Sequence, residues 1–166
     1  MRNLIAIPLL ALTVVIQSAI VPSFTLLSGY ADVLLVLLAA WALQEGVNTG
    51  FQWALLSALM MSIVSHLPWF IYVAGYAGVV MLAQLLQKRV WQVPMLAMFT
   101  VTFLGTVFMH LLTFVYLRLF GGSVSFSDAM GLVTLPSLLL NLLVAIPMFG
   151  MMRDLARWVF PSLEPA

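Results

Sequence analysis

The chain contains no cysteine and very little charge. Of its 166 residues, six are Lys or Arg, five are Asp or Glu, and 64% are hydrophobic. The absence of cysteine excludes disulfides, thiolate metal sites and cysteine nucleophiles. A soluble domain carries charge on about 25% of its residues, whereas only 7% of this chain is charged. So few charges cannot hydrate the surface of a globule, and we therefore expect an integral membrane protein whose solvent is the lipid bilayer.

Recognised catalytic motifs are also missing. The sequence has no H-E-x-x-H zinc motif, no G-x-S-x-G nucleophile motif and no glycine-rich phosphate loop. Neither His66 nor His110 has a second histidine or a carboxylate at the spacing of metal ligands. The net charge of +1 is not gathered into a basic patch. We therefore expect no enzymatic activity, no metal ion or other cofactor, and no binding to nucleic acid.

Six apolar stretches follow one another along a single transmembrane domain, residues 1–166. They are Leu4–Val21, Ala31–Leu43, Phe51–Ser65, Leu67–Leu86, Pro94–Leu117 and Met130–Met152. A helix needs about 20 residues to cross a hydrocarbon core about 30 Å thick, so the second and third stretches are short. They either cross a locally thinned bilayer, which we favour, or form a re-entrant hairpin with Gln44–Gly50 at its tip. The pattern predicts an all-α integral membrane protein, a compact bundle of about six transmembrane helices.

The basic residues predict the orientation of this bundle. With alternating crossings, Arg118 lies alone on one side, and the other five basic residues share the opposite side: Arg2, Lys88, Arg89, Arg153 and Arg157. Basic residues are enriched in the cytoplasmic loops of membrane proteins. We therefore expect both termini to be cytoplasmic, and the re-entrant alternative gives the same result.

Polar and small residues recur at helical spacing inside the apolar stretches. Small residues let helix backbones approach closely, and polar side chains hydrogen-bond between helices, with about 0.6–2 kcal/mol for each polar contact. We favour this packing role over the alternative, in which Thr106, His110 and Asn141 converge on a small ligand. The candidate residues are Ser62 in the third stretch, Ala74 and Gly78 in the fourth, Thr102, Gly105, Thr106 and His110 in the fifth, and Ser137 and Asn141 in the sixth.

Asp32 stands at the beginning of the second stretch. There it is either a helix cap, which we favour, or a buried functional carboxylate. A cap is plausible because a carboxylate accepts hydrogen bonds from the first N–H groups of a helix and faces the positive end of the helix dipole. We expect Asp128 to have the same role at the sixth stretch.

Several short motifs, taken in order, resemble the MreD family of rod shape-determining proteins over nearly the whole chain. The early motif is an acidic residue before a Leu-rich helix, A-D-V-L-L at 31–35, followed by a glycine-bearing turn at 45–51. The late motif is L-P-S-L-L-L-N-L-L at 135–143, then A-I-P at 145–147 and a basic tail. The family commonly has Gly-Leu-x-x-Asp in its third helix, and A-L-M-M-S at 58–62 aligns with it. Ser62 thus replaces the acidic residue.

This resemblance implies a multi-pass, non-enzymatic scaffold of the cell-wall elongation complex in the bacterial inner (cytoplasmic) membrane. The implied partner is an MreC-like single-pass membrane protein, with MreB filaments, the RodA glycosyltransferase and a class B penicillin-binding protein in the same machinery. Asp32, Pro136 and Pro147 join the packing residues above as candidates for helix packing or partner contact. The alternative function is the substrate-binding membrane subunit of an importer of small, vitamin-type solutes, because six short helices with a polar-lined interior also suit that role.

Overall fold

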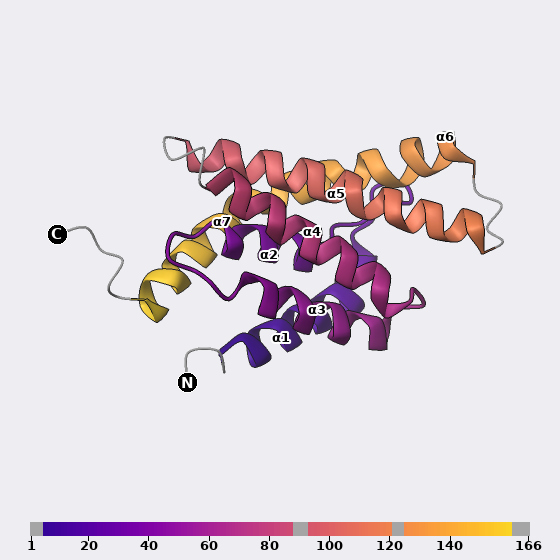
Figure 1. Cartoon of the computed structure of the whole chain (residues 1–166). Coiled ribbons are helices and arrows are strands. Elements are labelled where there is room, and N and C mark those ends of the chain that lie inside the picture. Colours follow the sequence, from indigo (N-terminus) through magenta and orange to yellow (C-terminus); the bar gives the residue numbers. More distant parts are fainter. Residues whose placement is uncertain (1–4, 88–92, 121–124, 161–166) are drawn as a thin grey trace.

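The computed structural model describes residues 5–87, 93–120 and 125–160. In these ranges the chain forms a helical bundle without a β-strand, apart from one isolated bridge between Leu26 and Gly29 (Figure 1). The predicted all-α fold is confirmed. The helices of ten or more residues are α1 Ala6–Ala19, α2 Val33–Ala42, α3 Gly50–Val64, α4 Trp69–Gln87, α5 Pro94–Leu119 and α7 Leu135–Val159. Three short pieces complete the described structure: the 3₁₀ turn η2 Val21–Ser23, α6 Phe126–Asp128 and the π-helical segment η3 Ala129–Thr134.

Four helical segments are long and apolar enough to cross a membrane. They are Ala6–Ser23, Trp69–Gln87, Pro94–Leu119 and Phe126–Val159. In the most apolar 18-residue window of each, only 33–39% of the residues are buried within the protein. The remaining surface carries large apolar side chains such as Leu12, Leu85 and Leu143. Such a surface suits lipid and not water, and the chain is therefore a multi-pass membrane protein.

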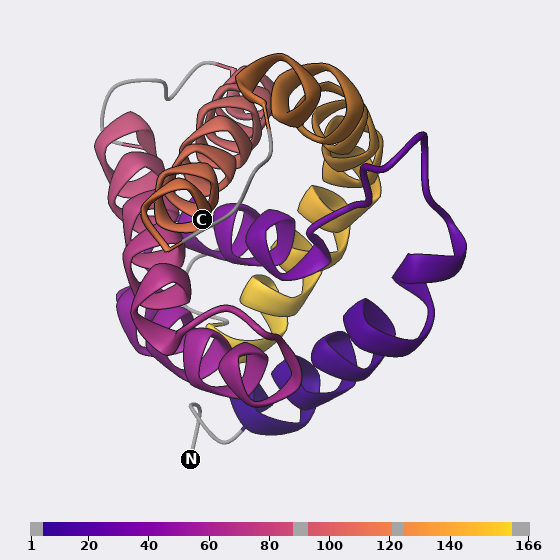
Figure 2. The same cartoon turned by 90° about the vertical axis from the view of Figure 1, so that its right-hand side faces the viewer.

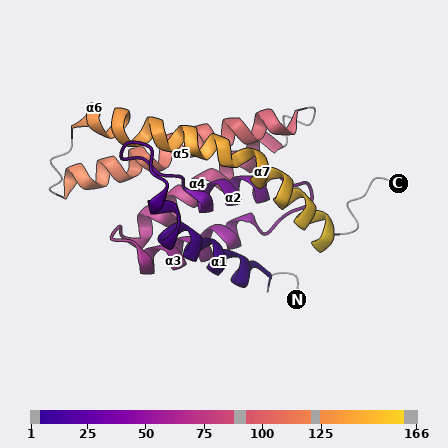
Figure 3. The ribbon, with the colours of Figure 1, turned by 180° about the vertical axis from the view of Figure 1, so that it is seen from behind.

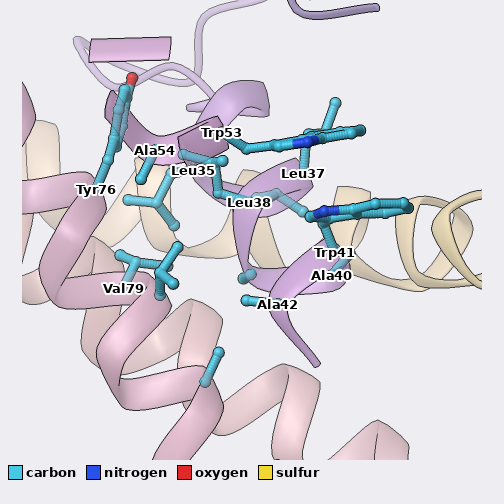
Figure 4. Close-up of a cluster of buried hydrophobic side chains, with 14 of the residues drawn as sticks. Leu35, Leu37, Leu38, Ala40, Trp41, Ala42, Trp53, Ala54, Tyr76 and Val79 are labelled. Carbon is cyan, nitrogen blue, oxygen red and sulfur yellow. The ribbon is translucent and has the colours of Figure 1, made fainter. Parts of the chain in front are cut away.

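Helix α2 occupies the centre of the bundle and is ringed by the other helices (Figure 2). Every residue from Leu34 to Ala42 is buried, which matches a sequence that is apolar on all faces of the helix. Trp41 of α2 stacks on Trp53 of α3 with a ring-centroid distance of 4.2 Å and an interplanar angle of 14° (Figure 4). Its indole nitrogen donates to Thr49 Oγ1 at 3.1 Å, so the buried ring keeps a hydrogen-bond partner.

The ten residues of α2 span about 15 Å, half of a hydrocarbon core. The turn after α2 nevertheless reaches the end of the bundle, because Gln87 at the end of α4 donates from Nε2 to Gln44 O at 2.7 Å. A re-entrant hairpin would require its tip, Gln44–Gly50, to lie inside the bundle. The tip lies at the end of the bundle instead. Before α2 the chain is non-helical, and residues 28–32 of this segment lie against η3 and α7.

The start of α1 and the end of α7 lie at the same end of the bundle, which we call the terminal end (Figures 1 and 3). The opposite, or far, end contains the end of α3, the start of α4, the end of α5, and α6 (Figure 1). Arg153 and Arg157 belong to the terminal end and Arg118 to the far end. Helix α7 bends in its second half (Figure 3), where Pro147 lies inside the helix and interrupts its hydrogen bonding.

Glycines bring α4 and α5 together. A side chain at Gly75 would overlap Met109, one at Gly78 would come within 2.6 Å of Phe108, and one at Gly105 would come within 2.7 Å of Val79. Both predicted glycines, Gly78 and Gly105, therefore lie in this helix–helix contact. Glycine is required at these positions because a Cβ would not fit between the two helices. In lipid no hydrophobic effect drives helices together, and close packing of this kind stabilises their contact.

Three predicted packing residues point away from the core of the bundle. Ala74 is exposed, because α4 turns residues 71, 72, 75, 76, 79 and 80 inward; Gly75, and not Ala74, joins Gly78 at the α5 contact. Ser62 is partly exposed and donates to Leu59 O of its own helix at 2.7 Å. Pro147 is also exposed. Ala74 and Pro147 therefore do not pack against the helices of this chain, and contact with a partner stays a prediction for all three.

Candidate functional site

Asp32 is the N-cap residue of α2, as predicted. Its Oδ1 accepts a hydrogen bond from Leu35 N at 3.0 Å and another from the Tyr76 hydroxyl at 3.3 Å. The cap therefore lies inside the bundle and not at a membrane surface. The cap is confirmed, and a functional role of this carboxylate stays a prediction.

The non-helical backbone around Asp32 is satisfied by side chains from two distant helices. Gln17 of α1 donates from Nε2 to Ala31 O at 2.8 Å and accepts from Val33 N through Oε1 at 2.7 Å. From α7, Ser137 Oγ accepts from Tyr30 N at 3.0 Å, and Asn141 Oδ1 accepts from Asp32 N at 2.7 Å. Irregular backbone inside a membrane protein requires such partners. These side chains replace the hydrogen bonds that a continuous helix would make.

Asn141 extends this network to α5. Its Nδ2 donates to Thr106 Oγ1 at 2.8 Å, and the Thr106 hydroxyl donates to Thr102 O at 2.7 Å. The predicted convergence of Thr106 and Asn141 is therefore present, and it takes the form of interhelical hydrogen bonding, which is the role we favoured. Thr102 is buried too, but its hydroxyl has no partner among the described residues.

Gly29 and Pro136 allow the segment before α2 to lie directly on α7. A Cβ at Gly29 would be 2.6 Å from Val133 O and 2.9 Å from Pro136 Cβ, so only glycine fits. Pro136 has no N–H group and cannot donate to the carbonyl one turn earlier, Leu132 O. That oxygen accepts from Ser28 N at 3.1 Å. The buried proline thus leaves an acceptor for the neighbouring segment.

A cavity of about 210 Å³ adjoins Asp32 toward the far end of the bundle. Its wall includes Asp32, His110, Tyr30 and Tyr72, and apolar residues of α3, α5 and η3. Asp32 is half-buried, because the cavity lies against it. A π-helical segment, η3, forms part of the wall, and such segments are frequent at functional sites.

His110 has a defined partner in this wall. Its Nδ1 lies 3.1 Å from Thr134 Oγ1, and the Thr134 hydroxyl donates to Ala129 O at 3.0 Å. The Thr134 hydroxyl thus links the imidazole to the backbone of η3. His110 is therefore held in one orientation by η3, in addition to lining the cavity.

The network and the cavity also contain residues that we did not predict, namely Gln17, Tyr30, Tyr72 and Tyr76. Gln17 is an amide inside the first apolar stretch, and a buried amide in a membrane helix needs partners. Tyr72 and Tyr76, four residues apart, mark one face of α4. These features were visible in the sequence, but the hydrogen-bond partners were not. Gln17 bonds Ala31 and Tyr76 bonds Asp32, both more than ten residues away, and only Tyr72 has a nearer partner, Ser65.

The prediction that Asp128 caps the sixth helix is wrong. Ser125 is the N-cap: its Oγ accepts from Asp128 N at 3.1 Å, and its hydroxyl donates to Asp128 Oδ2 at 2.7 Å. Asp128 is the third residue of α6. Its backbone N–H and its carboxylate both bond the Ser125 hydroxyl, so the two residues cap the helix together.

The structure thus brings Asp32, Thr106, Ser137 and Asn141 into one hydrogen-bonded network and places His110 at the adjoining cavity. In the described part of the chain, no group of three His, Cys, Asp or Glu residues is placed to hold a metal ion. Comparisons of the chain with protein-family models, with curated proteins and with solved structures found no match.

Proposed function

We propose that this protein is a non-enzymatic scaffold of the bacterial cell-wall elongation complex, similar to members of the MreD family. The observation that carries the proposal is a contact between the two motifs of that resemblance. Asp32 N donates to Asn141 Oδ1 at 2.7 Å across 109 residues of sequence, and Tyr30 N donates to Ser137 Oγ at 3.0 Å. The acidic motif and the L-P-S…N motif are therefore two parts of one structural unit, which gives a physical reason for their joint presence.

The shape of the chain supports a role in recognition within the membrane. The longest non-helical segments in the described ranges are 24–32 and 43–49, which leaves little surface for soluble partners. The outer faces of α1, α5 and α7 are apolar, so a partner with a transmembrane helix is the natural one. The scaffold would lie in the inner membrane with both termini in the cytoplasm, and its direct partner would be an MreC-like single-pass protein.

Depletion of the protein from a rod-shaped bacterial host tests this proposal. We expect the cells to widen and round while uptake of small nutrients remains normal, and we expect the protein to co-purify with an MreC-like protein in mild detergent. Asn141→Leu should weaken both complementation and co-purification, whereas the same change at the exposed Asn48 should not. Rod-shaped cells after complete depletion would contradict the proposal.

The cavity beside Asp32 favours a second candidate, the substrate-binding subunit of a small-solute importer. A chain with this function would leave cell shape unchanged when depleted. Growth would fail only when one particular nutrient is scarce. The same depletion experiment therefore separates the two functions.

A further inference from the structure

We propose that the cavity beside Asp32 binds a small organic cation, a protonated amine on an apolar body, with the Asp32 carboxylate as its counter-ion. This inference goes beyond the scaffold function and does not rest on it. A scaffold or an importer subunit could each have such a site.

Asp32 has no cationic partner in the described residues. A carboxylate withdrawn from water is costly unless it is paired with a positive charge. The ion pair found in the described residues, Arg153 with Asp154, is at the surface, and the described wall of the cavity contains no Lys or Arg. Asp32 is thus a half-buried acid without a Lys or Arg beside it, and the cavity is the open space against it. A cation bound there would provide the missing partner.

The rest of the wall offers further groups to a cation. Tyr30 and Tyr72 line the cavity, and aromatic rings attract ammonium groups. His110 lines it as well, and a neutral imidazole has one acceptor nitrogen. An ammonium group has only donors, so a wall with a carboxylate, an imidazole and tyrosine residues is complementary to it.

The size and polarity of the cavity also suit such a ligand. Met61, Met109 and Phe114 contribute to a mostly apolar wall around about 210 Å³. A cavity of about 150 Å³ in another protein accommodates benzene, so this one has room for an aromatic ring with a short chain. Inorganic cations need several oxygen ligands, which thioether and phenyl groups do not provide. An anion would meet Asp32 without a compensating positive charge.

The backbone at the site is also unusual. Tyr30 and Asp32 belong to a non-helical segment that packs on α7 and is held by Gln17, Ser137 and Asn141. Membrane proteins tolerate such backbone where it is covered by protein or lines a cavity, and interrupted helices are typical of substrate sites in transporters. A simple packing role would be met by a continuous helix.

The probe for this proposal is 2-phenylethylamine, compared with 2-phenylethanol, which has the same skeleton without the charge. Binding is measured by isothermal titration calorimetry on the full chain in lipid nanodiscs, with empty nanodiscs to subtract partitioning into lipid. We expect the amine to bind at least tenfold more tightly than the alcohol. Equal affinities would overturn the proposal, because the cavity would then be a general apolar site.

Asp32→Asn provides the critical variant, since asparagine keeps the N-cap and the size of the side chain. Loss of a charge-assisted hydrogen bond should weaken binding of the amine about tenfold to a hundredfold and leave binding of the alcohol unchanged. The matched control is Asp128→Asn, which removes an exposed carboxylate that does not line the cavity. A preference for the amine that survives Asp32→Asn would overturn the proposal.

Val133→Phe fills the cavity and keeps Asp32, so it tests the location independently of the charge. Both probes should lose binding, and retention of amine binding would show that the site lies elsewhere. Mass spectrometry of the purified protein gives a further readout. A co-purified amine would support the proposal, and a co-purified carboxylate or phosphate compound held in the same cavity would contradict it. None of these measurements depends on cell shape or on a partner protein.

Discussion

Replacing Asn141 by leucine should destabilise the bundle by about 2–4 kcal/mol. The Asn141 side chain is fully buried. Leucine has the same number of side-chain heavy atoms and the same branch point, so we expect the lost hydrogen bonds to dominate the effect. The variant loses the hydrogen bond to Thr106, with a contribution of about 0.6–2 kcal/mol. It also leaves Asp32 N without its acceptor at 2.7 Å, and an unsatisfied buried donor costs about 1–3 kcal/mol. The change should not reduce insertion into the membrane, because leucine inserts more readily than asparagine.

The free energy of unfolding can be measured by titration with sodium dodecyl sulfate in mixed micelles. The five tryptophans, among them the stacked pair Trp41 and Trp53, report unfolding by their fluorescence. Asn48→Leu is the matched control, since Asn48 is exposed in the turn after α2, and it should change stability by less than about 0.5 kcal/mol. If Asn141→Leu is as stable as the control, the network around Asp32 does not hold the bundle together.

Three further predictions concern packing and topology. Gly105→Ala should lower the free energy of unfolding by about 1–3 kcal/mol in the same assay, because the new methyl group would come within 2.7 Å of a side chain of α4. Gly150→Ala is the control and should be neutral or slightly stabilising, because its methyl group would have nothing within 4 Å. Equal effects of the two changes would refute close packing at Gly105. Ser57→Ala should stabilise the protein by about 1 kcal/mol, since the buried hydroxyl has no partner in the described residues; a loss of stability would reveal a missing partner. In this cysteine-free chain, a single cysteine replacing Glu45 should be shielded from impermeant thiol reagents in intact cells and one replacing Phe120 should react, whereas the opposite pattern would reverse the orientation.

Much of the local structure followed from the sequence. The stretch Pro94–Leu117 corresponds to α5, Pro94–Leu119, and Leu67–Leu86 corresponds to α4, Trp69–Gln87. Proline at a first helical position and long apolar runs define such helices locally. The cap at Asp32 was also predictable, because capping needs only the next few residues.

The last helix shows where local reasoning fell short. The predicted stretch Met130–Met152 is part of a longer helical segment, Phe126–Val159. Its beginning is set by the Ser125 cap and its continuation by η3. Its end carries charged residues that extend beyond the apolar run, so hydropathy alone placed both boundaries too far inward.

The sequence by itself determined that lipid surrounds the chain, that the chain is helical, and which polar residues need partners. These properties depend on charge content, the length of apolar runs and helical spacing, which can each be seen within one stretch. Only the tertiary structure decided which partners they have. Asp32 meets Asn141 across 109 residues, and Gly75 takes the place predicted for Ala74. The cavity exists because segments from α1 to η3 converge beside a carboxylate. Such convergence depends on how helices rotate and cross, and no local pattern in one stretch specifies the rotation of another.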